Sequence, residues 1–179
     1  MNQLDLFDLD TAPEDSRPLL EKSIKGFGMI PNLHAVMAGS PQVLEAYQML
    51  HQLFQNSSFD NDELTVIWQT INMEHSCHYC VPAHIAVAHM MKVDDTLIDA
   101  IVNHKQLPSE KLQVLRETTL KMVRERGNIA SVDVEAFYAV GYEPRQLMEI
   151  VLGLAQKVMS NYINHLAETP LDEPFKQFA

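Results

Sequence analysis

Apolar residues recur along the chain at the three- and four-residue spacing of helices that bury one face. Val43, Leu44, Tyr47 and Leu50, for example, fall together on one such face. No run of alternating β-branched and polar residues, which would indicate a strand, lies between turn residues. The pattern therefore predicts an all-α protein, a bundle of eight or nine helices without a sheet.

Helix-capping residues indicate where these helices begin and end. Asp94, Ser109 and Ser131 each precede a helical stretch as expected N-caps, and Gly26 and Gly28 are expected to end the first helix. Capping residues and first-turn prolines together predict helix starts near residues 16, 31, 41, 60, 82, 94, 109, 131 and 144.

The length of 179 residues and a hydrophobic fraction of 46% suit one domain with a sizeable core. We expect this domain at 17–172, with tails at 1–16 and 173–179. The chain has no apolar run of about 18 residues, so we expect no transmembrane helix. Its start is acidic and lacks the basic and apolar regions of a secretory signal, which favours a cytoplasmic location.

The charge balance restricts the class of partner. Acidic residues number 24 and basic residues 13, which gives a formal net charge of -11. A protein that binds nucleic acid or an anionic membrane needs a basic surface. We therefore expect neither nucleic acid nor a membrane as a partner, whereas a small neutral substrate remains compatible with the charge.

The only two cysteines, Cys77 and Cys80, are three residues apart. A structural disulfide between them would close a very small loop, so it would stabilise the fold little. A pair placed in this way is better explained by redox chemistry or by metal binding.

The residues that follow the pair favour redox chemistry at Cys80. Pro82 lacks an amide proton and is least disruptive in the first turn of a helix, which places Cys80 near a helix N-terminus. Free amides and the helix dipole stabilise a thiolate there. His84 lies one helical turn after Cys80, where it can take the thiol proton.

A thiolate at Cys80 would attack a peroxide oxygen and become a sulfenic acid. Cys77 is close enough in sequence to condense with it, which forms a Cys77–Cys80 disulfide that an external dithiol would reduce. Glu74 is three residues before Cys77, and we expect it to orient His84 or to relay a proton, directly or through water.

Zinc is the competing interpretation of the same residues. Its ligands would be Cys77, Cys80, His84 and either His75 or His78. Structural zinc usually joins two separate ligand pairs, but the chain has no second cysteine pair, and a helical domain of this size does not need metal to fold. We therefore expect no metal and no bound cofactor.

The motif and its surroundings resemble a known family. The stretch 77–84 resembles the C-x-x-C-x-x-x-H signature of the AhpD-like superfamily, which includes alkylhydroperoxidases and the carboxymuconolactone decarboxylase family. Residues 28–32 and 38–41 are similar to the G-x-x-P-N and S-P opening of its peroxidase-related branch. Residues 161–165 and 169–172 resemble the C-terminal segment of that branch.

The resemblance implies an AhpD-like bundle of about eight helices, with the motif at the start of a core helix near a subunit interface. It also implies a homo-oligomer, which would be a dimer, trimer or hexamer. By this analogy Cys80 is the peroxidatic cysteine, Cys77 the resolving cysteine and His84 the base. One departure concerns the family glutamate twelve positions before the first cysteine. Thr65 occupies that position here, and Glu74 is the expected replacement.

These observations predict a thiol peroxidase that reduces hydrogen peroxide or organic hydroperoxides and is reset by a protein or small dithiol. Two other hypotheses stay open. One is a non-redox enzyme on the same fold, similar to carboxymuconolactone decarboxylases, in which both cysteines are dispensable. The other is a binding protein whose assembly responds to thiol oxidation or to zinc.

Overall fold

The computed structural model describes residues 4–179, and the described chain is entirely helical. Its elements are η1 (Glu14–Ser16), α1 (Arg17–Phe27), α2 (Asn32–Met37), α3 (Pro41–Gln55), α4 (Asn61–Glu74), α5 (Cys80–Met90), α6 (Asp95–Val102), α7 (Glu110–Arg124), α8 (Ser131–Ala139), α9 (Pro144–Ala167) and η2 (Glu173–Phe178). The all-α prediction is confirmed, and the motif lies at the start of a helix, as expected.

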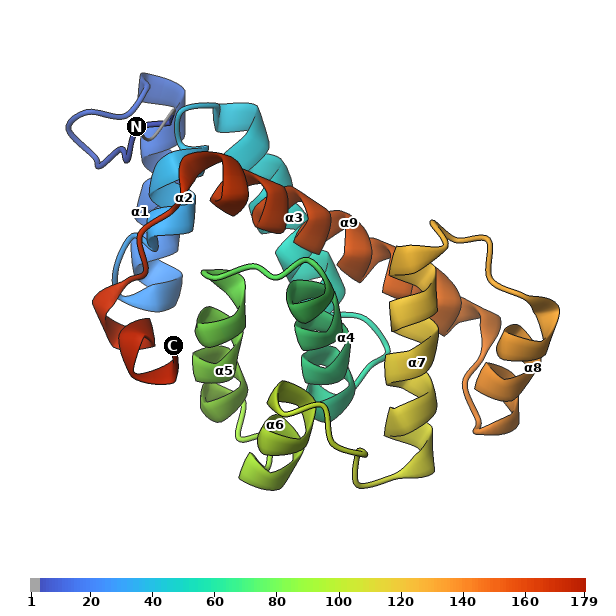
Figure 1. Cartoon of the computed structure of the whole chain (residues 1–179). Helices are drawn as coiled ribbons and strands as arrows, with labels where there is room; N and C mark the ends of the chain where they lie inside the picture. The colour runs from blue at the N-terminus through green and yellow to red at the C-terminus, as the bar shows by residue number, and fades with distance from the viewer. Residues whose placement is uncertain (1–3) are drawn as a thin grey trace.

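Helix α4 is the centre of the bundle and α9 spans its length (Figure 1). On one side α4 packs against α5 and α6, and on the other against α7. Helix α9 crosses from α8 at one end of the molecule to α2 at the other, and contacts α3, α4, α5 and α7 on the way. This arrangement brings one face of α9 over the turn between α4 and α5.

Most of the predicted helix ends are observed. Asp94 accepts a hydrogen bond from the amide of Thr96, and Ser109 caps α7 through the amide of Leu112. Ser131 is instead the first residue of α8, where its side chain makes no capping hydrogen bond. A further difference concerns the first helix, which continues through Gly26 and ends only at Gly28, whose left-handed φ of 75° suits glycine.

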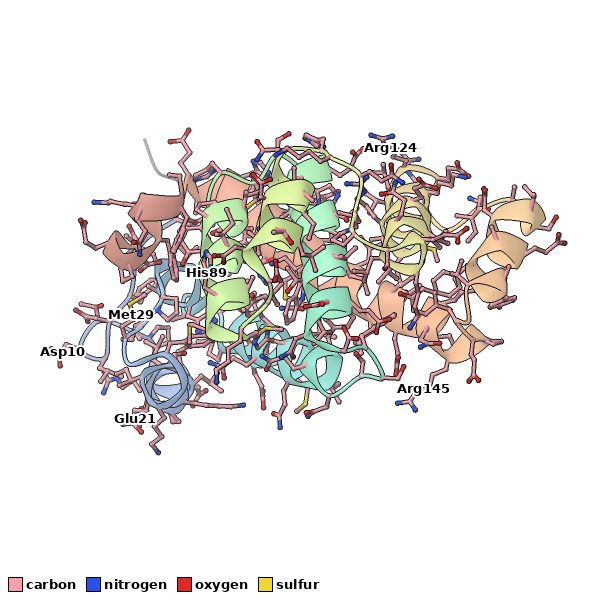
Figure 2. All side chains as sticks on the ribbon, turned by 90° about the horizontal axis from the view of Figure 1, so that it is seen from below. Asp10, Glu21, Met29, His89, Arg124 and Arg145 are labelled. Carbon is pink, nitrogen blue, oxygen red and sulfur yellow. The ribbon has the colours of Figure 1, made fainter. Side chains whose placement is uncertain are left out.

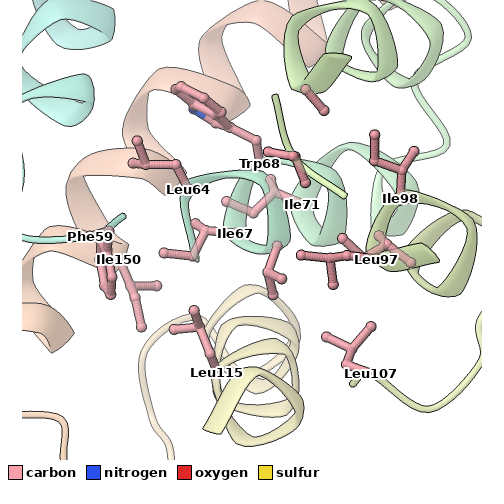
Figure 3. Packing of buried hydrophobic residues seen from close by; sticks show 14 of the residues in the cluster. Phe59, Leu64, Ile67, Trp68, Ile71, Leu97, Ile98, Leu107, Leu115 and Ile150 are labelled. Carbon is pink, nitrogen blue, oxygen red and sulfur yellow. The ribbon is translucent and has the colours of Figure 1, made fainter. Parts of the chain in front are cut away.

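The larger hydrophobic cluster surrounds α4 (Figure 3). Ile67, Trp68 and Ile71 of α4 are almost completely buried, and Leu115 of α7 and Ile150 of α9 pack against the same cluster. A smaller cluster lies between α1, α2, α3 and the start of α5, and both cysteines belong to it. The motif is therefore held inside packed side chains rather than on a surface loop.

The two segments expected to be tails pack against the bundle. In the N-terminal segment, of which residues 1–3 lie outside the described part, Ala12 is buried and Ser16 donates a hydrogen bond to the carbonyl of Ala38. In the C-terminal segment, the rings of Phe175 and Phe178 pack on side chains of the motif region and α5. The N-terminal segment thus buries side chains in the bundle, whereas the C-terminal segment lies on its surface with Phe175 and Phe178 partly buried.

The membrane prediction can be checked against the helices. Within residues 4–179, every helix is too short or too polar to cross a lipid bilayer.

Candidate active site

The turn between α4 and α5 places Cys77 directly beneath the end of α4. Ser76 adopts a left-handed conformation with φ of 51°. The amide of Ser76 donates to the carbonyl of Met73, and the amide of Cys77 donates to the carbonyl of Asn72. These two bonds form a Schellman motif, in which the residue after the left-handed position folds back onto the helix. The Cys77 side chain is fully buried as a result.

The two sulfur atoms lie side by side. Cys80 is the first residue of α5, and its amide donates a hydrogen bond of 3.2 Å to the sulfur of Cys77. Both residues are free cysteines, and Cys80 is 2% exposed. The predicted position of Cys80 at a helix N-terminus is confirmed, so the dipole of α5 favours a negative charge near it. The first-turn amides are engaged elsewhere, since those of Val81 and Ala83 donate to the carbonyls of Cys77 and Tyr79.

Helix α9 contributes a polar stripe that faces these sulfurs and that the sequence interpretation missed. Asn164 donates through Nδ2 to the sulfur of Cys80 at 3.2 Å and lies 3.9 Å from that of Cys77. Lys157 and Asn161 lie on the same face of α9 as Asn164, because they precede it by seven and three residues. All three α9 side chains are completely or almost completely buried. The sequence does contain a signal for this stripe, because Lys157, Asn161 and Asn164 are polar residues that recur at helical spacing in an otherwise amphipathic helix.

A chain of buried amides fixes the orientation of Asn161. Its Oδ1 is 2.8 Å from Nδ1 of His75, and its Nδ2 donates to Oδ1 of Asn72 at 3.0 Å. Asn72 in turn donates to Gln69 Oε1, and Gln69 donates to the carbonyl of Val81 in the first turn of α5. Because the hydrogen-bonded network already fixes these side chains, they lose little conformational freedom when they stabilise a charge. The amides therefore form a preorganised environment for a thiolate.

Lys157 and His84 form a buried pair. Lys157 Nζ lies 2.8 Å from His84 Nε2, and both side chains are less than 10% exposed. Burial and the neighbouring charge of Lys157 hold the pKa of His84 well below its ordinary value, so the imidazole is neutral and accepts from the lysine. An Nε2 that accepts requires a protonated Nδ1, and this Nδ1 has no hydrogen-bond partner within the described chain.

The two thiols have unequal acidities. Burial opposes ionisation of Cys80, but the hydrogen bond from the Cys77 thiol and the Lys157 ammonium outweigh it, and amides of Asn164 and Asn161 add to the effect. The pKa of Cys80 is lowered to about 5. The same hydrogen bond, burial and the charge on Cys80 raise the pKa of Cys77. At neutral pH the pair therefore holds one thiolate, on Cys80, and one thiol.

Cys80 borders a cavity and Cys77 does not. The cavity next to Cys80, hereafter the inner cavity, has a volume of about 80 Å³. His84 and Lys157 line it together with apolar side chains, among them Ala83 and Phe175. Cys80 is thus the cysteine that a small substrate can approach, with the Lys157–His84 pair beside it.

The structure does not bring Glu74 to this group. Its carboxylate forms a bidentate ion pair with Arg124 of α7, at N–O distances of 2.7 and 2.9 Å. Figure 2 shows Arg124 at the outer surface, on the far side of α4 from α5. The pair also lowers the pKa of Glu74, which is the opposite of what a proton donor requires. Lys157, and not an acid, is the residue that orients His84.

The position at which the AhpD-like pattern has a glutamate, here Thr65, also provides no carboxylate near the sulfurs. Thr65 donates its hydroxyl to the carbonyl of Asn61 within α4. Glu63 caps α4 together with Asp60 and accepts a hydrogen bond from Tyr142. Neither residue makes a described contact with the cysteines.

The remaining ligands of the zinc hypothesis have other partners. His78 contacts the carbonyl of Thr169 through Nε2, and His75 contacts Asn161. No group of three or more histidine, cysteine, aspartate or glutamate side chains within residues 4–179 is arranged to hold a metal ion. The fold and the site together define a helical protein with a buried C-x-x-C pair next to a lysine, in which Cys80 is the more acidic thiol.

Comparisons with known proteins identify the fold. A peroxidase-related protein from Ralstonia eutropha JMP134, described as an alkylhydroperoxidase AhpD core, superposes with a TM-score of 0.86 at 19% identity, over 97% of this chain and 94% of its own. A peroxidase-related protein from Silicibacter sp. TM1040 has a TM-score of 0.82 at 23% identity, over 99% and 96%. The chain therefore has the AhpD-like fold of peroxidase-related proteins.

The same fold occurs in a protein with another activity. The debrominase Bmp8 has a TM-score of 0.82 at 13% identity, over 98% of this chain and 95% of its own, and a variant of it was crystallised with 2,3,4-tribromopyrrole. No protein-family model and no curated protein matches the sequence. These comparisons show the fold alone, and any reaction has to be argued from the site.

Proposed function

We propose that this chain is a thiol-dependent peroxidase that reduces hydrogen peroxide or organic hydroperoxides through a Cys77–Cys80 disulfide. The observation that carries the proposal is the ionised sulfur of Cys80 at the inner cavity, with a second thiol held against it. The peroxidase-related structures with the same fold support it. The earlier expectation that Glu74 relays a proton is replaced by the Lys157–His84 pair.

In the first step the Cys80 thiolate attacks the terminal oxygen of the hydroperoxide, which carries the proton, and the O–O bond breaks. The sulfur is oxidised to a sulfenic acid and the peroxide is reduced to an alcohol, or to water from hydrogen peroxide. The leaving oxygen needs one proton. We assign its delivery to the Lys157–His84 pair, because Lys157 lies beside the sulfur and its pKa is lowered by burial.

In the second step the Cys77 sulfur attacks the sulfenic sulfur, which forms the disulfide and releases water. The pKa of Cys77 is raised in part by the negative charge on Cys80, and that charge disappears when Cys80 is oxidised. Oxidation therefore prepares Cys77 for its own deprotonation. A protein or small dithiol then exchanges with the disulfide, which returns two thiols and leaves the dithiol oxidised.

A thiol count tests the proposal. The reduced protein is mixed with one equivalent of cumene hydroperoxide or hydrogen peroxide, and free thiols, the disulfide and bound metal are measured. We expect both thiols to disappear within the turnover time, with a disulfide between Cys77 and Cys80 in the mass spectrum. The Cys77→Ser variant should stop at the sulfenic acid, and Cys80→Ser should not react. Retention of both thiols in the wild type would refute the proposal.

The same samples separate the two alternatives. A non-redox enzyme similar to carboxymuconolactone decarboxylases would keep its activity when both cysteines are replaced by serine. A zinc-dependent binding protein would carry one metal ion per chain and two thiols protected from alkylation. The buried ammonium of Lys157 beside the sulfurs argues against a cation in that position.

A further inference from the structure

The inner cavity at Cys80 opens toward a much larger groove. This outer groove has a volume of about 620 Å³, within the range of about 300–1,000 Å³ that is typical of small-molecule sites. The two spaces share six lining residues, so they adjoin: Phe27, His34, Tyr47, His51, Val87 and Met90. Hydrogen peroxide would need only the inner cavity, whereas the outer groove has room for an organic body.

The wall of the outer groove is largely apolar and aromatic. Phe27 of α1 and Met90 of α5 border it, and they remain 42% and 71% exposed. His34 is buried and His51 is partly buried in the wall, and desolvation lowers their pKa values to about 3 and about 4, so both rings are neutral. Gln48, Gln52 and Gln55 also line the groove, but most of its exposed surface is apolar, which favours the hydrocarbon part of a ligand.

Charge is distributed unevenly around this path. The chain has 24 acidic residues and a net charge of -11, yet none of the residues that line the groove or the inner cavity is acidic. The charged lining residues are three lysines: Lys22 and Lys25 at the groove and Lys157 at the inner cavity. Lys22 and Lys25 lie three residues apart on α1, are exposed, and form no ion pair within residues 4–179. Two free ammonium groups beside an apolar groove match a carboxylate on an apolar body.

We propose that the preferred substrate is an amphipathic organic acid that carries a hydroperoxide, such as a fatty-acid hydroperoxide. Its carboxylate contacts Lys22 and Lys25, its hydrocarbon body fills the outer groove, and its hydroperoxide reaches Cys80 in the inner cavity. This inference rests on the proposed peroxidase function and names the substrate class for it. The reaction is the one given above, with the hydroxy acid as the reduced product.

A matched pair of substrates tests it. We compare kcat/KM for 13-hydroperoxy-octadecadienoic acid and its methyl ester, which differ only in the charge of the head group. The wild type should prefer the acid by at least about threefold at low ionic strength, and the preference should fall in high salt because surface charges are screened. The double variant Lys22→Gln/Lys25→Gln should lose the preference and keep its activity on the ester. The double variant Lys105→Gln/Lys121→Gln, which removes an equal charge at two surface ion pairs outside the groove, should keep it.

A second measurement does not depend on turnover. Decanoate and decanol are compared for their ability to slow alkylation of Cys80. Decanoate should protect better in the wild type and lose that advantage in the double lysine variant. If no hydroperoxide oxidises the thiols but decanoate protects, the peroxidase function fails and the acid-binding site stands. Equal protection by decanoate and decanol, or equal kcat/KM for acid and ester, would overturn the site, and so would a dimer that shields Lys22 and Lys25 from amine labelling.

Discussion

Lys157→Met is the substitution that most directly tests how Cys80 is activated. Lys157 is 1% exposed, hydrogen-bonds to His84 and is one of the groups that lower the pKa of Cys80. Methionine is apolar and of similar length, so it fills the same space, and the Cys80 thiolate that is left without its cation becomes neutral by taking up a proton. The variant should therefore fold and change mainly the acidity of the thiol.

The expected size of the effect follows from the charge that is removed. An opposite charge within about 4–6 Å shifts a pKa by about 1–3 units, so the pKa of Cys80 should rise from about 5 to about 7. In the wild type, the lowered pKa keeps the Cys80 sulfur ionised as the pH falls. In the variant, the sulfur becomes protonated at a higher pH. At pH 6 the thiolate fraction should drop from roughly 90% to roughly 10%, whereas at pH 8 both proteins should be about 90% ionised or more.

The assay is the rate of iodoacetamide alkylation between about pH 4.5 and pH 9. It is run on a Cys77→Ser background, in which the serine hydroxyl can still donate a hydrogen bond to Cys80. We expect the midpoint of the profile, with each curve scaled to its own high-pH plateau, to move from about pH 5 to about pH 7. At pH 6 the wild type should then react at roughly 90% of its plateau rate and Lys157→Met at roughly 10% of its own. Lys105→Met is the matched control and should leave the profile unchanged. Superimposable profiles for wild type and Lys157→Met would refute the assignment of Lys157 as the activating cation.

Three further changes give distinct results. Asn164→Leu removes the amide that donates to the Cys80 sulfur and should raise the pKa of Cys80 by about 1 unit. The same alkylation profile measures this shift, and an unchanged midpoint would contradict it. Glu74→Gln should leave that profile and the peroxide rate within about twofold of wild type, since its carboxylate belongs to a surface ion pair; a larger loss would return a catalytic role to it. Gly153→Ala places a Cβ 2.7 Å from the buried ring of Phe54 and should cost about 1–3 kcal/mol in urea unfolding, whereas Gly26→Ala meets no neighbour and should not destabilise.

The position of the cysteines in the core has a consequence for turnover. Cys77 is fully buried and Cys80 nearly so, beneath a C-terminal segment that is held by the carboxylate of Asp172. Asp172 accepts hydrogen bonds from the Tyr79 hydroxyl and from the amide of Asn32, which joins the segment to the motif and to α2. The inner cavity at Cys80 is much smaller than a protein, and we therefore propose that a small dithiol, and not a protein, reduces the disulfide.

The sequence by itself determined the fold class and the reactive pair. Helical periodicity and capping residues such as Asp94 and Ser109 act locally, so they predicted the helices and most of their ends. The spacing of Cys77, Cys80 and His84 is also a local property, and Pro82 placed it at a helix start. These features depend on neighbours within a few residues, and a single sequence contains that information.

Tertiary structure alone decided what surrounds the sulfurs. Lys157 and Asn164 follow Cys80 by 77 and 84 residues, and they meet it only because α9 crosses the α4–α5 turn. Glu74 is near the cysteines in sequence, yet the direction of its side chain on α4 leads it to Arg124 on the opposite side. Side-chain direction and helix crossing are set by packing of the whole bundle, which spacing along the chain does not encode. The place of the cysteine pair at a helix start was therefore predictable, whereas the lysine beside it was not.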